Sequence, residues 1–427
     1  MLLTLKIKLK LSKEQIEVLE KTSDNARLLY NKLLEEKIKY YEETKKYLSY
    51  YIQQKELKGI TSEFLTFDSK KEILRTLDNN YKSFFELIKT NKDKNPKTPK
   101  FRGYKYFFTL SFVQDFIIKD NKIVISLPNR KRLILNLEYN LPIINCSCNR
   151  HKNESSDIKQ LKIFKKDNNY YASIIYEKQE QKSTNILENI ISIDLGKKNL
   201  VSYYNFLKNI GVVYNSKYLT KNQKFLDKRV DELKSIRDKK VKYSRKWKRI
   251  NKKVKNVNRK KKTQTNLTLQ KLSKDLSNLN TDVLIGELTN LKQNIVSKNK
   301  HKLNRQMQNN WNLSTFIRLL TYKVWLKGNA VIKVNEAWTS KTCCKCGTID
   351  YSQTLADRQY ICECGNNINR DINGAINILK QHLGNYNLPL DFDTLSISER
   401  FSWCDIKKMN RNDKFCKQLG ILFVFIL

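Results

Sequence analysis

Three acidic residues, Asp194, Glu287 and Asp371, have the types and positions needed for metal-dependent chemistry. Asp194 and Glu287 each follow a short, strand-like apolar run, and Asp371 opens an apolar stretch that ends at Leu379. A single carboxylate in such a place is usually a solvated strand end. Three carboxylates brought together repel one another unless a cation compensates their charge. The trio therefore predicts a divalent-metal site suited to phosphodiester chemistry.

The composition indicates which partner such a site serves. The chain has 427 residues, enough for two or more domains with a substantial core. Its 83 Lys and Arg residues against 42 Asp and Glu residues give a formal charge of +41, which attracts polyanions. The sequence lacks a basic amphipathic helix with large aromatic anchors, which an anionic membrane would require. Nucleic acid is therefore the predicted partner.

The sequence also bears on location. No apolar run approaches the roughly 20 residues that span a bilayer, and lysines interrupt the leucine-rich start at residues 1–11. We therefore expect a cytoplasmic protein with no membrane partner and leave its oligomeric state open. In that compartment cysteines serve as metal ligands or free thiols rather than as disulfides.

The first half of the chain is predicted to form a small antiparallel β-barrel that carries a helical insertion. Apolar residues alternate with lysines in residues 1–11, and short β-rich runs separated by turns recur over residues 105–182. Between them, Ser12 and Gln15 have the spacing of a capping box that starts an amphipathic helix. Residues 1–11 and 105–182 are therefore assigned to the barrel, and residues 12–104 to a helical domain.

The second half is predicted to contain an RNase H-like nuclease domain, assigned to residues 188–336 and 369–385. The strand that ends near Asp194 is followed by strand-like runs at residues 199–205 and 210–214. This succession is the three-stranded opening of an RNase H-like fold.

A long helical segment within this domain, residues 221–280, is far more basic than the rest of the chain. A charge run is most often a solvated helix face, but this density favours a surface that follows phosphates. The residues predicted to contact nucleic acid are Lys239, Lys240, Lys246, Trp247, Lys248, Arg249, Lys252, Lys253 and, beside the third acid, Arg370. The C-terminal tail, residues 386–427, receives no assignment.

Two cysteine pairs that each end in Cys-Gly predict a zinc ribbon over residues 337–368. The predicted ligands are Cys343, Cys346, Cys362 and Cys364, with Cys344 as an alternative in the first pair. One residue separates the cysteines of the second pair, where two are usual. A further group, Cys146, Cys148 and His151, lacks a second pair and is interpreted as free thiols beside a histidine.

Together these motifs resemble those of the TnpB family, the RNA-guided nucleases encoded by insertion sequences. The resemblance spans residue 1 to about residue 380 and rests on Ile193-Asp194-Leu195-Gly196, Ile285-Gly286-Glu287-Leu288, the cysteine pairs and Arg370-Asp371-Ile372-Asn373-Gly374. It implies a multidomain α+β protein: a WED-like or OB-like β-barrel with a helical, REC-like insertion, followed by a RuvC domain with an inserted zinc ribbon.

The resemblance also implies an activity and its cofactors. The implied activity is RNA-guided DNA endonuclease, with Asp194, Glu287 and Asp371 binding two Mg²⁺ ions. The implied cofactors and partners are Mg²⁺, Zn²⁺, a guide RNA, and target DNA in double-stranded and single-stranded form.

Two positions depart from the family's pattern. Asn369 stands where the family usually has Asp, two residues before the third catalytic acid. In many relatives the glutamate of the second motif sits one residue earlier, where this chain has Gly286. Glu287 is assigned because it is the only acid at that strand end.

Three other functions share part of this pattern. A compact type V CRISPR effector nuclease has the same catalytic motifs. A nuclease-dead, RNA-guided DNA-binding repressor would have lost one or more of the three acids, all of which are present here. A DNA-joining transposase commonly ends its acidic trio in Glu, whereas this trio ends in Asp.

Overall fold

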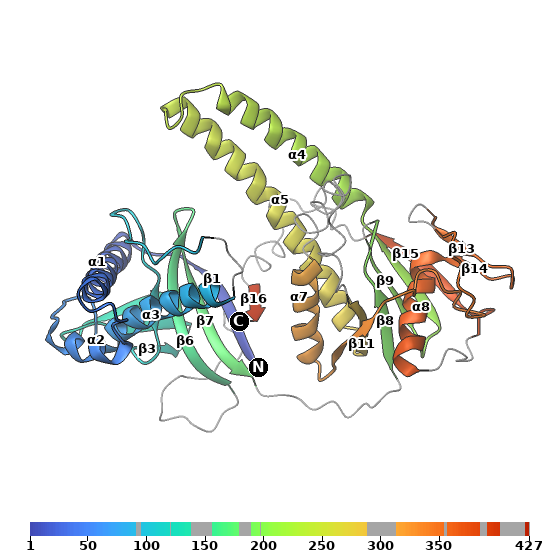
Figure 1. Cartoon of the computed structure of the whole chain (residues 1–427), viewed down its shortest axis with the longest axis horizontal. Coiled ribbons are helices and arrows are strands. Elements are labelled where there is room, and N and C mark those ends of the chain that lie inside the picture. Colours follow the sequence, from blue (N-terminus) through green and yellow to red (C-terminus); the bar gives the residue numbers. More distant parts are fainter. Residues whose placement is uncertain are drawn as a thin grey trace. The chain divides into compact units, whose positions relative to one another are not determined.

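The computed structural model divides the chain into two units, each held together by its own contacts (Figure 1). The first unit comprises Met1–Gln179 and Arg411–Leu427, and the second comprises Glu180–Asn410. The structure describes residues 1–90, 95–119, 121–137, 156–178, 189–196, 198–287, 313–353, 357–384, 391–401 and 423–426. The predicted thiol group of Cys146, Cys148 and His151 lies outside these residues.

A five-stranded antiparallel sheet organises the first unit, in the order β16-β1-β7-β6-β2. Its strands are β1 (Leu2–Leu9), β2 (Leu110–Phe112), β6 (Ser156–Lys166), β7 (Asn169–Lys178) and β16 (Phe423–Ile426). The alternation predicted for the start of the chain is confirmed, because Leu3, Leu5 and Ile7 of β1 are each at most 1% exposed. This sheet therefore turns one apolar face toward the core of the unit.

Three helices cover the core of the first unit: α1 (Lys13–Thr44), α2 (Tyr50–Glu56) and α3 (Phe67–Lys89), with a 3₁₀ turn at Leu57–Gly59. The predicted capping box starts α1. The Ser12 hydroxyl accepts a hydrogen bond from the Gln15 backbone N–H at 3.2 Å, and Gln15 Oε1 accepts one from the Ser12 N–H at 2.8 Å.

A second, three-stranded antiparallel sheet shares this core. It consists of β3 (Phe116–Lys119), β4 (Lys122–Ser126) and β5 (Arg132–Asn136). In the part of the chain that the structure describes, these strands pair only with one another, because short turns join them. The predicted β-barrel is thus two sheets over one core rather than one sheet closed by hydrogen bonds.

A six-stranded mixed sheet forms the centre of the second unit, in the order β12-β11-β8-β9-β10-β15. Its strands are β8 (Ile190–Asp194), β9 (Asn199–Asn205), β10 (Ile210–Asn215), β11 (Asp282–Glu287), β12 (Val331–Asn335) and β15 (Ser396–Phe401). The first three strands form an antiparallel meander, and β11 and β12 run parallel to β8. The predicted succession of three strands from Asp194 onward is confirmed.

Helices of the second unit pack on this sheet and extend beyond it. α8 (Arg370–Leu383) lies across β8 and β9, and α7 (Leu313–Trp325) packs against the C-terminal half of α5 (Arg245–Ser277). α4 (Lys217–Asp238) and α5 lie side by side as a hairpin that reaches well past the sheet (Figure 1). The segment predicted as one long basic helical region is therefore two antiparallel helices.

The C-terminal tail, which received no assignment from the sequence, contributes one strand to the six-stranded sheet and one to the five-stranded sheet. β15 pairs parallel with β10, and β16 pairs antiparallel with β1. Among the helices that the structure describes, none is long and apolar enough to cross a membrane.

Candidate functional site

Asp194 ends β8 beneath the helix α8. The apolar residues before it are buried, so the strand is anchored in the core and presents its final carboxylate at the end of the sheet. Gly374 of α8 lies against this carboxylate, because a Cβ at position 374 would be 3.1 Å from Asp194 Oδ2. A glycine at this position therefore allows α8 to approach Asp194 closely.

Asp371 lies in the first turn of α8 and is fixed from two sides. Asn369 is the N-cap residue, and its Oδ1 accepts hydrogen bonds from the backbone N–H groups of Asp371 at 3.0 Å and Ile372 at 3.4 Å. The side-chain amide of Asn199, the first residue of β9, donates a hydrogen bond to Asp371 Oδ2 at 2.5 Å. The departure at position 369 thus preserves a residue that caps the helix.

The strand register separates Gly286 from Glu287. Ile285 of β11 pairs with Ile193 of β8, and the next position along each strand is Gly286 on β11 and Asp194 on β8. Alternate positions of a strand belong to opposite faces of a sheet. Position 286 therefore belongs to the face that carries Asp194, and position 287 belongs to the other face. The side chain of Glu287 lies outside the described part of the structure.

Glu336 is a fourth acid at this end of the sheet, which the sequence analysis did not single out. It follows the last residue of β12, the neighbour of β11. A Cβ at Gly286 would overlap Glu336 Oε2 and lie 3.1 Å from Glu336 Cβ, so the glutamate fills the space beside this glycine. The signal was present in the sequence, because Glu336 also follows a strand-like run, residues 331–335.

The charges of these acids act on one another. Burial raises the pKa of Asp194 to about 8, with further increases from the charges of Asp371 and Glu336, while the nearby Arg370 guanidinium opposes the shift. Burial raises the pKa of Glu336 to about 7. Arg370 is only 8% exposed, so it lies beside the acids rather than on the open surface. Its predicted contact with nucleic acid stays a prediction.

This group of side chains fits a divalent cation. Carboxylate oxygens are the ligands that hard cations prefer, and a cation would relieve the repulsion that raises the pKa of Asp194. Ser202 pairs with Asp194 across β8 and β9, is 1% exposed, and has no hydrogen-bond partner for its hydroxyl among the described residues. A buried hydroxyl with no partner is an additional oxygen available at the same place.

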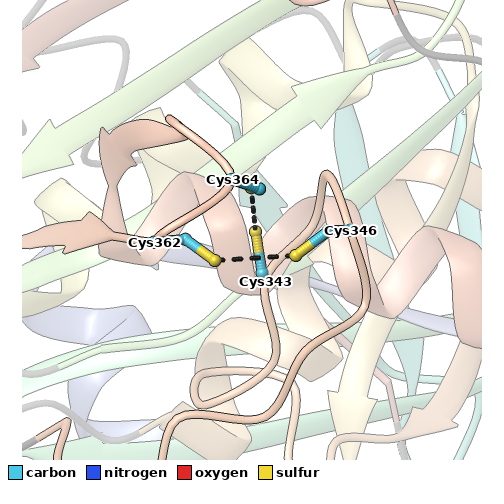
Figure 2. Close-up of side chains that lie close together, drawn as sticks. All are labelled: Cys343, Cys346, Cys362 and Cys364. Carbon is cyan, nitrogen blue, oxygen red and sulfur yellow. Dashed lines mark hydrogen bonds between the residues drawn. The ribbon is translucent and has the colours of Figure 1, made fainter.

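The cysteine cluster is a second candidate metal centre. Figure 2 shows the side chains of Cys343, Cys346, Cys362 and Cys364 converging, and all four sulfur atoms lie within 4.8 Å of one another. The Sγ–Sγ distances are 3.7 Å for Cys343 and Cys364 and 3.5 Å for Cys346 and Cys362. Zn–S bonds of about 2.3 Å in a tetrahedron place sulfur atoms roughly 3.8 Å apart. The cluster could therefore bind zinc, and the short second pair does not prevent its ligands from meeting.

Backbone turns orient the cysteine side chains toward one another. Gly347 and Gly365 follow the last cysteine of each pair and adopt φ values of 79° and 80°, which favour glycine. The second pair lies in the turn between β13 (Gln359–Ile361) and β14 (Asn367–Asn369), and α8 begins directly after β14. The ribbon therefore leads straight into the helix that carries Asp371.

Cys344, the alternative ligand, has a different role. Its side chain is fully buried in the core that includes α8, and burial raises the pKa of its thiol to about 12. It is absent from the group of converging cysteines among the described residues. Its backbone N–H donates a 2.8 Å hydrogen bond to Asn373 Oδ1, and Asn373 donates to the Thr342 carbonyl at 2.7 Å. These bonds attach the cysteine loop to α8.

The predicted nucleic-acid contacts other than Arg370 lie at the distal end of the α4–α5 hairpin. The predicted basic residues there are all exposed: Lys239, Lys240, Lys246, Lys248, Arg249, Lys252 and Lys253. Trp247 is half-buried between Arg237, whose guanidinium is 5.5 Å from the ring, and Tyr243, whose ring is 5.4 Å away. Trp247 therefore packs the tip of the hairpin, while the cations remain available to phosphates.

Two parts of the chain match known families. Residues 314–378 match the family described as Cas12f1-like, TNB domain, and residues 1–46 match the family described as Helix-turn-helix domain. The first match contains α7, β12, the cysteine cluster and the start of α8. In this structure the second match corresponds to β1 followed by one long helix, α1.

Two curated proteins are similar over about half of this chain. The TnpB-like protein L79 of Acanthamoeba polyphaga mimivirus is 30% identical over 208 residues, which cover 46% of this chain and 38% of the viral protein. The CRISPR-associated endodeoxyribonuclease Cas12f2 of a Micrarchaeota archaeon is 27% identical over 232 residues, covering 51% of this chain and 41% of that protein. The matches thus span about two fifths of each relative's own length.

A solved structure shares the fold more widely. The protein in a cryo-EM structure of a Cas12f1–sgRNA–target DNA complex matches with a TM-score of 0.58 and 16% identity, over 86% of this chain and 83% of that one. At that level of identity the similarity establishes a shared mixed α+β fold.

Metal-free protein should lose stability as the pH rises from about 4 to about 8. Asp194 and Glu336 have folded-state pKa values of about 8 and about 7, whereas a carboxyl group in an unfolded chain titrates near roughly 4. The folded chain therefore retains protons that the unfolded chain releases, and this advantage disappears as the pH passes the folded values. Thermal unfolding across this interval, with and without Mg²⁺, measures the effect. Asp194→Asn should flatten the profile, and an equally steep profile in that variant would contradict the assignment.

Purified protein should contain one zinc ion per chain, measured by elemental analysis. Cys346→Ala should lose that zinc and unfold at a lower temperature, because metal binding at such a site contributes folding free energy. Cys344→Ala is the matched control: it removes a buried thiol of the same loop and should retain the zinc. Loss of zinc in Cys344→Ala alone would show that the ligand set is wrong.

Proposed function

We propose that the chain is a member of the TnpB family and an RNA-guided nuclease of the type V kind that hydrolyses phosphodiester bonds of DNA. The observation that carries this proposal is the position of Asp194 beneath α8, close enough to Asp371 in the first turn of that helix for the charge of Asp371 to raise the pKa of Asp194. The formal charge of +41 supports a polyanionic partner. The similarity to an archaeal endodeoxyribonuclease supports DNA as the substrate.

In this proposal the two units of the chain have different functions. The strand order of the second unit, in which an antiparallel meander is followed by parallel β11 and β12, supports the RNase H-like, RuvC-type interpretation. The first unit, two sheets covered by helices, would serve as the WED-like and REC-like part. In this proposal a guide RNA pairs with the target strand, and the protein reads a short adjacent motif and the backbone of the heteroduplex.

Each polar group at the nuclease site has a defined task in this proposal. Bound Mg²⁺ supplies activation of water and neutralisation of the charge that develops on the phosphate. Asp194 and Asp371 would hold the metal, in a two-ion arrangement as the family resemblance implies. Asn199 holds the Asp371 carboxylate through the 2.5 Å hydrogen bond, and the Asn369 cap fixes the backbone on which Asp371 stands.

The hairpin and the ribbon would bind nucleic acid around this site. The exposed lysines at the distal end of α4 and α5 form a basic surface on a projecting support, suited to phosphate contacts along a duplex or single strand. The zinc-bearing ribbon, which leads into α8, would bind target strand close to the carboxylates.

A compact type V CRISPR effector is the second candidate, and the similarity to the archaeal Cas12f2 favours it. The two candidates share the chemistry and differ in where the guide originates. Sequencing the RNA that co-purifies with the chain separates them: a guide derived from the end of a transposable element supports the first, and a repeat-derived guide supports the second. A random mixture of host RNA would contradict both.

Asp194→Ala should reduce DNA cleavage by about a thousandfold while leaving RNA and target binding unchanged, because only the metal-dependent step loses its ligand. Cleavage by the RNA-loaded protein and binding by gel shift measure the two properties. Asp231→Asn, an exposed acid on α4, is the control and should cleave like the parent. Full cleavage by Asp194→Ala would refute the nuclease site.

Replacing Lys246, Lys248, Lys252 and Lys253 together by Gln should weaken nucleic-acid binding and make it less sensitive to salt. For duplex DNA, removing one lysine–phosphate interaction lowers the steepness of log K against log salt concentration by about 0.9. The same four residues changed to Arg keep the charge and should keep the parent slope. An unchanged slope in the Gln variant would exclude the hairpin tip as a phosphate-binding surface.

A further inference from the structure

We infer that Glu336 provides the third carboxylate of the nuclease site, in the place that a glutamate at position 286 would occupy. This inference rests on the proposed nuclease function and replaces Glu287, which the sequence analysis assigned. It goes beyond the family pattern, which expects this acid on β11.

The first support for the inference is the register of the parallel strands β8, β11 and β12. Gly286 follows the pair Ile285–Ile193, and it pairs with Val334 of β12. Leu284 and Val334 both belong to the buried cluster that packs against α8. Glu336 lies two residues beyond Val334, and Asp194 lies two residues beyond Ser192, the partner of Leu284. By the alternation of strand positions, Asp194, Gly286 and Glu336 therefore belong to the α8 side of the sheet.

Glu287 belongs to the alternate positions of the same strand. Its register partner is Asn335, and Val283 and Ile285 of β11 share its set of positions. A shift of one residue along a strand moves a side chain to the opposite face. Position 287 is thus placed on the wrong side of the sheet to complete a site with Asp194.

The second support for the inference is the fit between Gly286 and the Glu336 side chain. A Cβ at position 286 would overlap Glu336 Oε2 and lie 3.1 Å from Glu336 Cβ. The absence of a side chain on β11 is therefore what allows the Glu336 carboxyl group to lie over this strand. A glutamate side chain at position 286 would therefore occupy the space that the Glu336 side chain now fills.

The surroundings of the group support a ligand there. Glu336 fills the space beside Gly286, and Gly286 and Asp194 each follow the Ile285–Ile193 pair on their strands. Ser202, the register partner of Asp194, is 1% exposed and leaves its hydroxyl without a partner among the described residues. The site thus gathers carboxylates from three elements: Asp194 on β8, Glu336 at the end of β12 and Asp371 on α8. The Ser202 hydroxyl adds a buried oxygen at the same place. Oxygen ligands of this kind are what a divalent cation requires.

Matched neutral variants test the assignment. We would compare Glu336→Gln, Glu287→Gln and Asp194→Ala in the full chain with its co-purified RNA, following Mn²⁺ binding by electron paramagnetic resonance and cleavage of DNA complementary to that RNA. Glu336→Gln should weaken Mn²⁺ binding by at least roughly tenfold and reduce cleavage to the level of Asp194→Ala. Glu287→Gln should stay within about twofold of the parent in both.

The outcomes separate this inference from the proposed function. If Asp194→Ala loses cleavage and Mn²⁺ binding but Glu336→Gln keeps both, Glu336 is not the third ligand. If Glu287→Gln loses both instead, the acid lies on β11 after all. If Asp194→Ala itself cleaves normally, the proposed nuclease site fails, whatever Glu336 does.

A variant with the carboxylate moved to β11 distinguishes loss of the metal ligand from loss of activity by misfolding. The double variant Gly286→Glu with Glu336→Gly moves the acid from the end of β12 to β11 and removes the side chain with which it would overlap. Mn²⁺ binding and cleavage should return above the level of Glu336→Gln, with thermal unfolding reported for each variant. Failure of a folded double variant to bind Mn²⁺ better than Glu336→Gln would overturn the idea that the two positions share one space.

Discussion

Close packing of α8 against β8 and β9 is the contact from which the candidate nuclease site arises. Gly374 removes the side chain that would keep the helix away from Asp194. Asn369 begins the helix beside the end of β14, and Asn199 attaches Asp371 to the start of β9. Since Asp371 stands in the first turn of this helix, its position relative to Asp194 is determined by how α8 seats on the sheet.

The same helix connects the two candidate metal centres. Asn373 and Asn377 of α8 are buried, and both donate hydrogen bonds to backbone carbonyls of the loop that carries the first cysteine pair. Buried amides without such partners would destabilise the core, so the loop and the helix hold each other in place. A metal in the ribbon would therefore stabilise the segment from which Asp371 emerges. In the proposed function the ribbon would thus support the carboxylates as well as bind nucleic acid.

Charge is distributed unequally over the molecule. A chain with a formal charge of +41 attracts polyanions and its hairpin tip exposes many cations, yet its candidate nuclease site is a half-buried group of acids. Like charges in a poorly solvated place raise their pKa values, and a divalent cation removes that cost. Asp194 and Glu336 would thus remain partly protonated without metal and become fully charged with it. In the proposed function, the basic surface would attract the polyanion and the half-buried acids would bind the metal.

Local patterns in the sequence were sufficient for much of this architecture. The spacing of the cysteine pairs identified the four thiols that converge, because ribbon ligands come from two short turns. The alternation in β1, the capping box of α1 and the strand before Asp194 were likewise readable, since each depends on neighbours within a few residues. Pairing between distant segments could not be predicted from these local patterns. The residues of the tail that form β15 and β16 gave no local sign of the strands with which they pair.

The choice of the third acid shows the difference most clearly. The sequence by itself determined that acids follow apolar strands, because local periodicity carries that information, and its resemblance to the TnpB family marked Gly286 as a departure. Only the tertiary structure decided that Gly286 faces Glu336 across β11 and β12. Strand register sets which face a residue belongs to, and register between segments so far apart depends on how the whole sheet packs beneath α8.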